Sequence, residues 1–502
     1  MKKFFRPESV VFLAIWVLLI LFGRVNLFRD PGTFWHTVVG QQILASHHFP
    51  TADIFSFTFH GQPWTAHEWL MECLMGLIYG GFGFDGLLIL SAAALAGFYT
   101  WIFSRLWRSG LGLPLASLLL ALVLAASAHH FHVRPHVLSL IFLGLTFAWL
   151  CDFEAGRQSL RSLFWLWPLF IIWTNSHGAV LAGLGTLGLT LGGWTLLFLC
   201  RQDSPLKSTR DLLLLSLLLL GCILTAFLNP YGAELPRTWL DIVKSPVIPQ
   251  VIQEHASLFR EAGNNWLIMV FGLFFLACLV GTLPRRPRVT WLLPVVWLAL
   301  TCSRVRNAPF FAVTAVLALA EFFPQVHWAR WLSDRGSAIF RLQPTGPPRP
   351  PLDFKAWLVP GTGVLLTVVV SLASLKITGH GLTRLDPRHW PLELLPDLKR
   401  YEETHSLGTP IMNDMLFGGF LILYTPRLQV FVDDRCELYG DQFLLNYAHN
   451  DPDFIAGWIN RSGARMALTV PGSGLDHYFE QATGWRLVKR TAAGFLYRRD
   501  GA

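Results

Sequence analysis

The side chains with the clearest capacity for chemistry begin at Asp30, which follows directly on the first long apolar run of the chain. The segment RDPGTFWHTVVG, residues 29–40, places this carboxylate and His36 just beyond that run. A carboxylate in this position can accept the backbone N–H groups at the start of a following helix. It can equally take a proton from an acceptor group at a lipid–water boundary. The residues alone leave both roles open.

His67 and Glu68 form a second acid–base pair further along the same segment. Their side chains could transfer a proton or bind a metal ion. Adjacent residues on a helix point in different directions, however, and a capping or hydrogen-bonding role is an equally good interpretation. The seven cysteines show no Cys-x-x-Cys spacing, so they predict neither a zinc site nor a disulfide framework.

Three arginines lie where apolar runs end. Arg134 belongs to HHFHVRPH, which also contains His136, while Arg304 and Arg306 belong to RVRN. A guanidinium is a permanent cation with a planar fork of donors that suits phosphate or carboxylate groups. Because such groups are costly beside an apolar run, we expect at least one of them to bind an anion. The histidine-rich segment could instead bind a metal.

Further polar residues lie next to other apolar runs. In WTNSHG, a polar turn is a better interpretation of Asn175 and His177 than a catalytic pair. Glu254 lies in a later connection. Polar residues near the end of the chain either contact acceptor or donor or, in the acidic run of VFVDDRCELYG, make a turn after a strand: Asn413, Asp414, Asp433, Asp434, Arg435 and Glu437.

The elements that must position these residues are membrane helices. Of the 502 residues, 53% are hydrophobic and only 14% charged, against about 25% charged in soluble domains. A helix needs roughly 20 apolar residues to cross a bilayer, and backbone groups in lipid must be satisfied within the helix. We predict eleven transmembrane helices, near residues 9–27, 84–104, 111–128, 136–151, 162–175, 178–200, 211–228, 264–282, 289–302, 307–324 and 356–375.

The distribution of Lys and Arg predicts the orientation of these helices. The connections on the side of the N-terminus hold more than twice as many basic residues as the opposite connections. Since cytoplasmic loops are the basic ones, the N-terminus is predicted in the cytoplasm and the residues after about 376 outside it. The net charge of +8 belongs to these loops. No basic-aromatic module predicts nucleic-acid binding.

We divide the chain into a transmembrane domain, residues 1–375, and a small extracytoplasmic α/β domain, residues 376–502. The first external loop, 28–68, is predicted to contain one interfacial helix and to lead into a second, near 66–80. The apolar face of the first is formed by the pairs Phe34/Trp35, Val38/Val39 and Ile43/Leu44. A Pro-rich cytoplasmic linker covers 325–355. The last domain alternates short β-like and helical runs and ends in a hairpin through Ala492 and Ala493.

All of the candidate residues fall on the external side in this topology, whereas the cytoplasmic connections hold mainly ordinary Arg, Lys and Ser. Polar groups at the ends of several spans, all on one side, favour a polar cavity that opens outward.

These features resemble the C-type glycosyltransferase (GT-C) superfamily: a cytoplasmic N-terminus, one span, a long external loop that starts with an aspartate, many further spans and a trailing external domain. More closely, RDPGTFWHTVVGQQIL, PTADIFSFTFHGQPWTAHEWL, RPH, WTNSHG, NPYG, RVRNAPFF and GGFLI…VFVDDRCELYG are similar to a bacterial branch of membrane glycosyltransferases related to protein O-mannosyltransferases and aminoarabinose transferases. The resemblance covers nearly the whole chain.

The resemblance implies an α-helical polytopic membrane protein in the bacterial inner membrane that transfers a sugar from a polyprenyl-phosphate donor to a glycan, lipid or protein acceptor. It implies that Asp30 activates the acceptor, with His67 and Glu68 near it as catalytic residues. The substrate-binding candidates are His36, Arg134, His136, Asn175, His177, Glu254, Arg304 and Arg306. Many members carry adjacent acids in the first loop, but Pro31 and Gly32 follow Asp30 here. We therefore assign no metal ligand and leave a divalent cation open.

Two other functions compete with this interpretation. A transporter or flippase of a lipid-linked envelope precursor would use similar spans and cationic pockets, but its polar groups should continue to the cytoplasmic face and its halves should repeat. A non-catalytic envelope assembly protein would show no cavity near Asp30.

Overall fold

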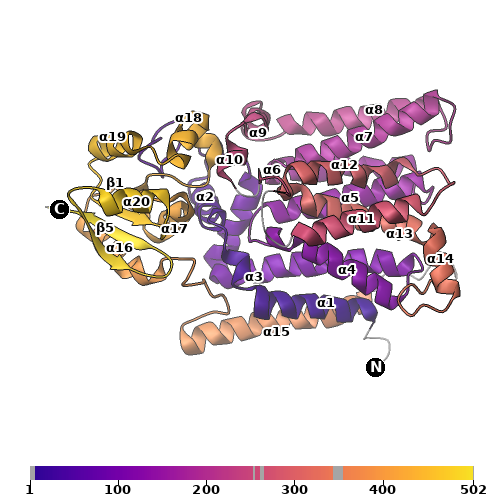
Figure 1. Ribbon diagram of the computed structural model, residues 1–502, viewed down its shortest axis with the longest axis horizontal. Coiled ribbons are helices and arrows are strands. Elements are labelled where there is room, and N and C mark those ends of the chain that lie inside the picture. The colour runs from indigo at the N-terminus through magenta and orange to yellow at the C-terminus, as the bar shows by residue number, and fades with distance from the viewer. Residues whose placement is uncertain (1–5, 253–254, 260–264, 343–353, 501–502) are drawn as a thin grey trace.

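The structure is a computed structural model that describes residues 6–252, 255–259, 265–342 and 354–500. The molecule is elongated, with a bundle of nearly parallel helices at one end and a mixed α/β domain at the other (Figure 1). The first external loop lies between these two parts.

Each of the eleven predicted apolar runs forms a helix. Seven helical stretches among the described residues are long and apolar enough to cross a membrane, which makes the chain a multi-pass membrane protein. The other four runs form shorter helices, so length alone supports seven spans rather than eleven. The helices are α1 (Pro7–Val17, continued by Leu18–Gly23), α3 (Trp69–Arg108), α4 (Leu113–Ser127), α5 (His136–Glu154), α6 (Leu166–Ser176), α7 (Val180–Leu199), α8 (Thr209–Leu224), α11 (Asn265–Val280), α12 (Val289–Ser303), α13 (Ala308–Phe322) and α15 (Phe354–Thr378).

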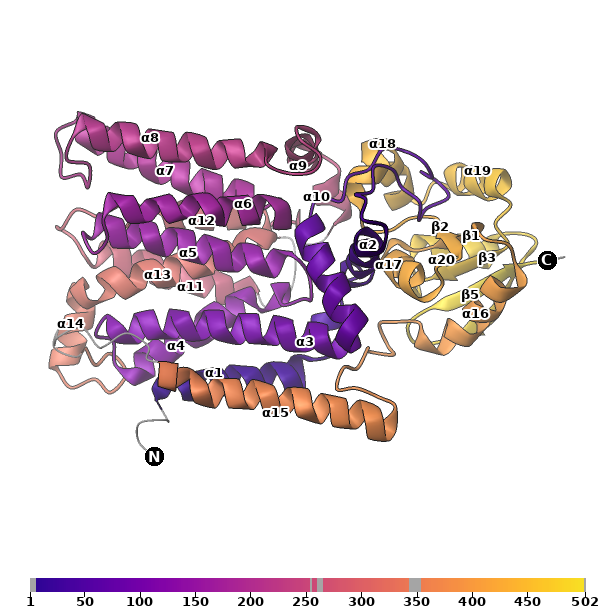
Figure 2. The same cartoon turned by 180° about the vertical axis from the view of Figure 1, so that it is seen from behind.

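Helix α13 lies at the centre of the bundle and packs against α3, α4, α5, α11 and α12. Its alanines, among them Ala312, Ala315 and Ala318, are buried and let the neighbouring helices approach closely. By contrast, α15 runs along α1 on the outside of the bundle, as both views show (Figure 2). It leaves Leu365 and Leu366 exposed, as expected for a lipid-facing helix.

The first external loop contains α2 (Gly32–Ser46), which packs tightly on the first turns of α3. A Cβ atom on Gly40 would lie 1.6 Å from the backbone oxygen of Glu72, so the two helices touch through their backbones. The predicted second helix of the loop begins at Trp69 rather than at 66, and it continues into the span after a kink at Gly83, where φ is 58° and ψ is −153°.

The apolar face of α2 does not lie on a membrane surface as predicted. Phe34 is fully buried, with its ring centroid 4.8 Å from that of Trp390 and 5.8 Å from that of Phe420, and Trp35 and Val39 are buried in the same cluster. The C-terminal domain supplies this cover, because its helix α17 (Met415–Tyr424) presents an apolar face of its own to α2. Amphipathicity predicts which face is covered but not what covers it.

The C-terminal domain is built on a five-stranded sheet in the order β2-β1-β3-β5-β4. Strands β2 (Leu428–Val430), β1 (Thr409–Asn413) and β3 (Met466–Thr469) are parallel, and the hairpin of β4 (Trp485–Arg490) and β5 (Phe495–Arg499) adds to β3 in antiparallel fashion. The remaining helices are α16 (Leu395–Thr404), α18 (Cys436–Ala448), α19 (Pro452–Ser462) and α20 (Gly474–Gln481).

The first external loop also attaches to the edge of this sheet. The Phe57 N–H donates to Val430 O at 3.0 Å, and the Val430 N–H donates to Phe55 O at 3.0 Å. The edge strand β2 is therefore covered by a segment that begins far away in the sequence, which satisfies its free backbone groups. This pairing holds the loop and the domain in one register.

The predicted cytoplasmic linker, 325–355, is partly structured. Helix α14 (His327–Asp334) occupies its first part, with Ala329 buried against the bundle. Its proline-rich part, 343–353, lies outside the described residues.

Candidate active site

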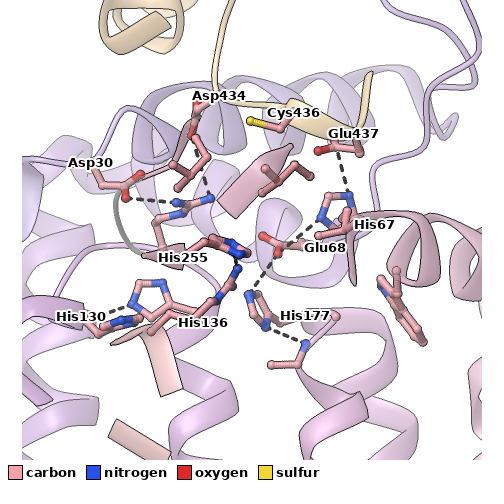
Figure 3. A pocket seen from close by; sticks show the side chains of 18 of the residues that line it. Asp30, His67, Glu68, His130, His136, His177, His255, Asp434, Cys436 and Glu437 are labelled. Carbon is pink, nitrogen blue, oxygen red and sulfur yellow. Dashed lines mark hydrogen bonds and ion pairs between the residues drawn. The ribbon is translucent and has the colours of Figure 1, made fainter. Parts of the chain in front are cut away.

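A cavity of about 700 Å³ opens where the ends of the spans, the first external loop and the C-terminal domain meet (Figure 3). Nine of the eleven predicted site residues line it: Asp30, His36, His67, Glu68, Arg134, His136, His177, Arg304 and Arg306. These residues come from sequence positions up to 276 apart, so the fold brings together groups that the sequence only placed on a common side.

One carboxylate oxygen of Asp30 contacts the start of the following helix, and the other faces the cavity. Its Oδ1 accepts the backbone N–H of Gly32 at 2.8 Å and so shapes the turn into α2. Its Oδ2 lies 3.0 Å from Nη1 of Arg134 and faces the cavity. Gly32 is required here, since a Cβ atom would lie 2.9 Å from Nε of Arg134.

Arg134 bridges two carboxylates rather than one. Besides Asp30, its Nη2 lies 3.9 Å from Oδ2 of Asp434 in the C-terminal domain. Trp35 holds Asp434 from the other side through a 2.8 Å hydrogen bond from its Nε1 to Oδ1. Burial raises the pKa of Asp434 to about 8, opposed by the charge of Arg134 and assisted by that of Asp30. The site is therefore completed by the second domain.

Glu68 lies at the centre of the cavity among three imidazoles (Figure 3). Its oxygens are 3.2 Å from Nε2 of His36, 3.3 Å from Nε2 of His177 and 3.6 Å from Nε2 of His67. The expectation that His67 and Glu68 point apart was wrong, because α3 begins only at Trp69 and both side chains precede it. Burial alone would raise the pKa of Glu68, but the imidazoles hold it well below its usual range.

The three imidazoles differ in charge. Burial would lower the pKa of His67, but its interactions with Glu68 and Glu437 raise it to about 9. Burial lowers the pKa of both His36 and His177 to about 3. His67 is thus a cation at neutral pH, and its two neighbours are neutral hydrogen-bonding groups.

Arg304 and Arg306 line the cavity at the corner between α12 and α13. The Nη1 of Arg306 contacts Nε2 of His255, a lining residue that the sequence reasoning did not select. The walls nearby are apolar and include Trp239 of α9 (Glu234–Lys244) and Phe310 of α13. Cations beside an apolar wall suit an amphiphile with an anionic head group.

One predicted site residue that the structure describes, Asn175, does not line the cavity. Asn175 accepts a 2.8 Å hydrogen bond from Nε1 of Trp69 and donates to the backbone oxygens of Ile171 and Leu228, so it joins the end of α6 to its neighbours. These hydrogen bonds engage both the oxygen and the nitrogen of its amide, so Asn175 has a structural role. Glu254 lies outside the described residues.

The sequence reasoning left Asp434 and Glu437 undecided between turn chemistry and substrate contact. Asp433 makes the turn, accepting from the backbone N–H of Arg435 at 3.0 Å. Asp434 and Glu437 face the cavity, and Nε1 of Trp64 donates to Oε1 of Glu437 at 3.0 Å. The sequence pattern around α18 could have predicted that these two side chains face the cavity only if the position of the C-terminal domain relative to the helix bundle had been known.

Among the described residues, no group of three or more His, Cys, Asp or Glu side chains has an arrangement that could hold a metal ion. The carboxylates of Asp30 and Asp434 are bridged by the guanidinium of Arg134, which already supplies a positive charge between them.

A second cavity, of about 930 Å³, lies at the opposite end of the bundle. There Arg105 and Arg157 contact Asp152 at 2.7 and 2.6 Å, and Arg157 also contacts Glu321. The prediction of polar clusters on one side only is therefore wrong. The sequence could not show this network, because Asp152 and Glu321 meet only when α5 packs on α13. The core between the cavities is apolar and includes Phe147.

No family model matches the sequence, and no curated protein matches it. Among solved structures, the chain is similar to the oligosaccharyltransferase of Archaeoglobus fulgidus tethered to an acceptor peptide, at 12% identity and a TM-score of 0.54, over 92% of this chain and 68% of that one. It is similar to ArnT from Cupriavidus metallidurans bound to undecaprenyl phosphate, at 15% identity and a TM-score of 0.50, over 97% of each chain.

A third similar structure is the arabinofuranosyltransferase AftD from Mycobacteria, at 13% identity and a TM-score of 0.51. The match covers 98% of this chain and 41% of that one. At these identities the likeness shows a shared fold.

Proposed function

Because the chain has the C-type glycosyltransferase fold that its sequence led us to expect, we propose that it transfers a sugar from a polyprenyl-phosphate donor to an acceptor at the extracytoplasmic face of the bacterial inner membrane. The observation that carries this proposal is Asp30, a carboxylate at the edge of a cavity that also holds three arginines and an apolar wall. A base, anion-binding groups and a lipid surface are what such a transfer needs.

In the proposed reaction, Asp30 takes the proton of the acceptor nucleophile as that nucleophile bonds to the anomeric carbon of the sugar. The bond between that carbon and the phosphate oxygen breaks, and its electron pair leaves with the polyprenyl phosphate. Attack opposite the leaving group inverts the anomeric centre. Arg134 keeps the Asp30 carboxylate oriented through its 3.0 Å contact.

The phosphate of the donor is proposed to lie near Arg304 and Arg306, which are permanent cations at the mouth of the span ends. The polyprenyl chain would then follow the apolar wall near Trp239 and Phe310. The likeness to ArnT, whose structure holds undecaprenyl phosphate, supports a donor of this kind.

The proposal is tested with Asp30→Asn, which keeps the size of the side chain and its bond to Gly32. We expect transfer from polyprenyl-phosphate sugars to fall by roughly 100- to 10,000-fold, as for loss of a general base. Binding of undecaprenyl phosphate should persist, because Arg304 and Arg306 are intact. Unchanged transfer by Asp30→Asn would remove the proposed base.

A transporter of a lipid-linked precursor is the second candidate. The second cavity, at the opposite end of the bundle, favours it. The cavity that contains Asp30 reaches Leu95 of α3, and the second cavity reaches Trp101 of the same helix. These two residues are separated by about 9 Å along the helix axis. Proteoliposomes with a fluorescent polyprenyl-phosphate lipid separate the two functions. We expect no accelerated flipping in them, and rapid flipping without sugar transfer would favour the transporter.

A further inference from the structure

Among the described residues, the arginines that line the outer cavity and the carboxylates that line it come from different elements. Every lining arginine comes from a connection between spans: Arg134, Arg304 and Arg306. Every lining carboxylate comes from the first external loop or the C-terminal domain: Asp30, Glu68, Asp434 and Glu437. An amphiphilic donor in this cavity would therefore meet arginines from the connections between spans and carboxylates from the first external loop and the C-terminal domain.

Among these groups, His67 lies between two carboxylates from different domains. Its Nε2 is 3.6 Å from Oε1 of Glu68, and its Nδ1 is 3.8 Å from Oε1 of Glu437. Both distances are too long for hydrogen bonds. The buried Nδ1 of His67 has no hydrogen-bond partner among the described residues. Such atoms are costly unless a ligand or water satisfies them.

A sugar hydroxyl fits this arrangement, because it both donates and accepts a hydrogen bond. It could accept from Nδ1 of His67 and donate to Oε1 of Glu437, bridging the 3.8 Å gap between them. Glu437 is held in place for this contact by Nε1 of Trp64. A carboxylate on the sugar would instead face two carboxylates, Glu68 and Glu437, against one cation, His67, and be repelled.

We propose that Glu68, His67 and Glu437 form the sugar subsite of the cavity, and that this subsite selects neutral or amino sugars over sugars that carry a carboxylate. This inference rests on the proposed function, since it assumes a lipid-linked sugar in the cavity. It adds a substrate class and assigns a specificity role to Glu437, a residue of the C-terminal domain.

The inference is tested by equilibrium binding, which does not depend on turnover. The probes are non-hydrolysable undecaprenyl phosphonates that carry glucose, glucosamine or glucuronic acid. For the unaltered protein, we expect the glucose and glucosamine probes to bind on the order of 100-fold more tightly than the glucuronic acid probe. Glu437→Gln should reduce this ratio about 10-fold, because it removes one of the repelling charges while keeping an acceptor for Trp64. The control is Glu480→Gln, an exposed acid of α20, which should leave the ratio unchanged.

Equal binding of all three probes, or a ratio that Glu437→Gln does not change, would overturn the subsite. Binding of none of the probes would overturn it as well. A preserved binding ratio with no sugar transfer from the corresponding phosphate donors would instead contradict the proposed function and leave the subsite standing. The two ideas therefore fail by different observations.

Discussion

Asp53 of the first external loop and Arg435 of the C-terminal domain form an ion pair of 2.8 Å in which both side chains are completely buried. Arg435 also contacts Asp433 at 2.6 Å and lies over the ring of Trp64, 4.7 Å from its centroid. Asp434 and Glu437 flank this arginine in the sequence and face the cavity. The ion pair thus connects the position of the second domain to the geometry of the candidate active site.

Replacing Arg435 with Met should therefore destabilise the protein strongly, since Asp53 and Asp433 would be left buried without a cation. We expect a loss of about 3–5 kcal/mol, measured as a lower melting temperature of the purified protein in detergent. Arg486→Met is the matched control, because its ion pair with Asp500 is exposed and worth at most about 1 kcal/mol. Similar melting shifts for the two variants would contradict the role of Arg435.

The contact between α2 and α3 predicts a steric effect at Gly40. Gly40→Ala places a Cβ atom 1.6 Å from the backbone oxygen of Glu72, so the two helices must move apart. We expect a marked loss of thermal stability and of sugar transfer, because Glu72 and Glu68 move with α3. Gly81→Ala, where nothing lies within 4 Å of the added Cβ, is the control. Equal tolerance of both alanines would show that α2 and α3 do not pack as described.

The protonation of His67 predicts a dependence of stability on pH. Its pKa is raised from 6.5 to about 9 in the folded protein. Its contribution to stability is therefore full below pH 6.5 and is lost as the pH rises toward 9. The melting-temperature difference between the unaltered protein and His67→Gln should shrink over this interval. The matching decrease in the difference between their free energies of unfolding is about 3 kcal/mol.

His477→Gln provides the control for this pH series, because His477 is an exposed residue of α20. Its difference from the unaltered protein should stay constant between pH 6.5 and 9. A His67→Gln difference that also stays constant would show that His67 is not a cation between Glu68 and Glu437.

The cations at the corner of α12 and α13 predict a specific binding defect. Arg306→Gln should weaken binding of undecaprenyl phosphate by about 10- to 100-fold, the range for loss of one charge-assisted hydrogen bond. Arg237→Gln is the control, because Arg237 is exposed and pairs only with the neighbouring Glu234 in the described structure. Equal binding by both variants would place the phosphate elsewhere in the cavity.

The sequence by itself determined the membrane part of this protein with some accuracy. Apolar runs must become helices in lipid, so the eleven runs and the order of their connections followed from composition alone. The alternation of the connections placed Asp30, Glu68 and Arg306 at the same end of the bundle, and the basic loops predict that this end is extracytoplasmic. The short runs, such as α6, could not be counted as spans from composition, because length alone does not decide how deeply a helix lies.

Only the tertiary structure decided what surrounds these residues. The amphipathic pattern of the sequence predicted the apolar face that contains Phe34 and Val39. It did not predict that the C-terminal domain, rather than lipid, packs against this face. The helix start at Trp69 turned His67 and Glu68 toward each other, and the amide of Asn175 was taken up by Trp69. Asp434 lies about 400 residues from Asp30 and reaches it only through Arg134. Local patterns report periodicity and charge, whereas contacts between distant segments depend on which apolar faces bury one another.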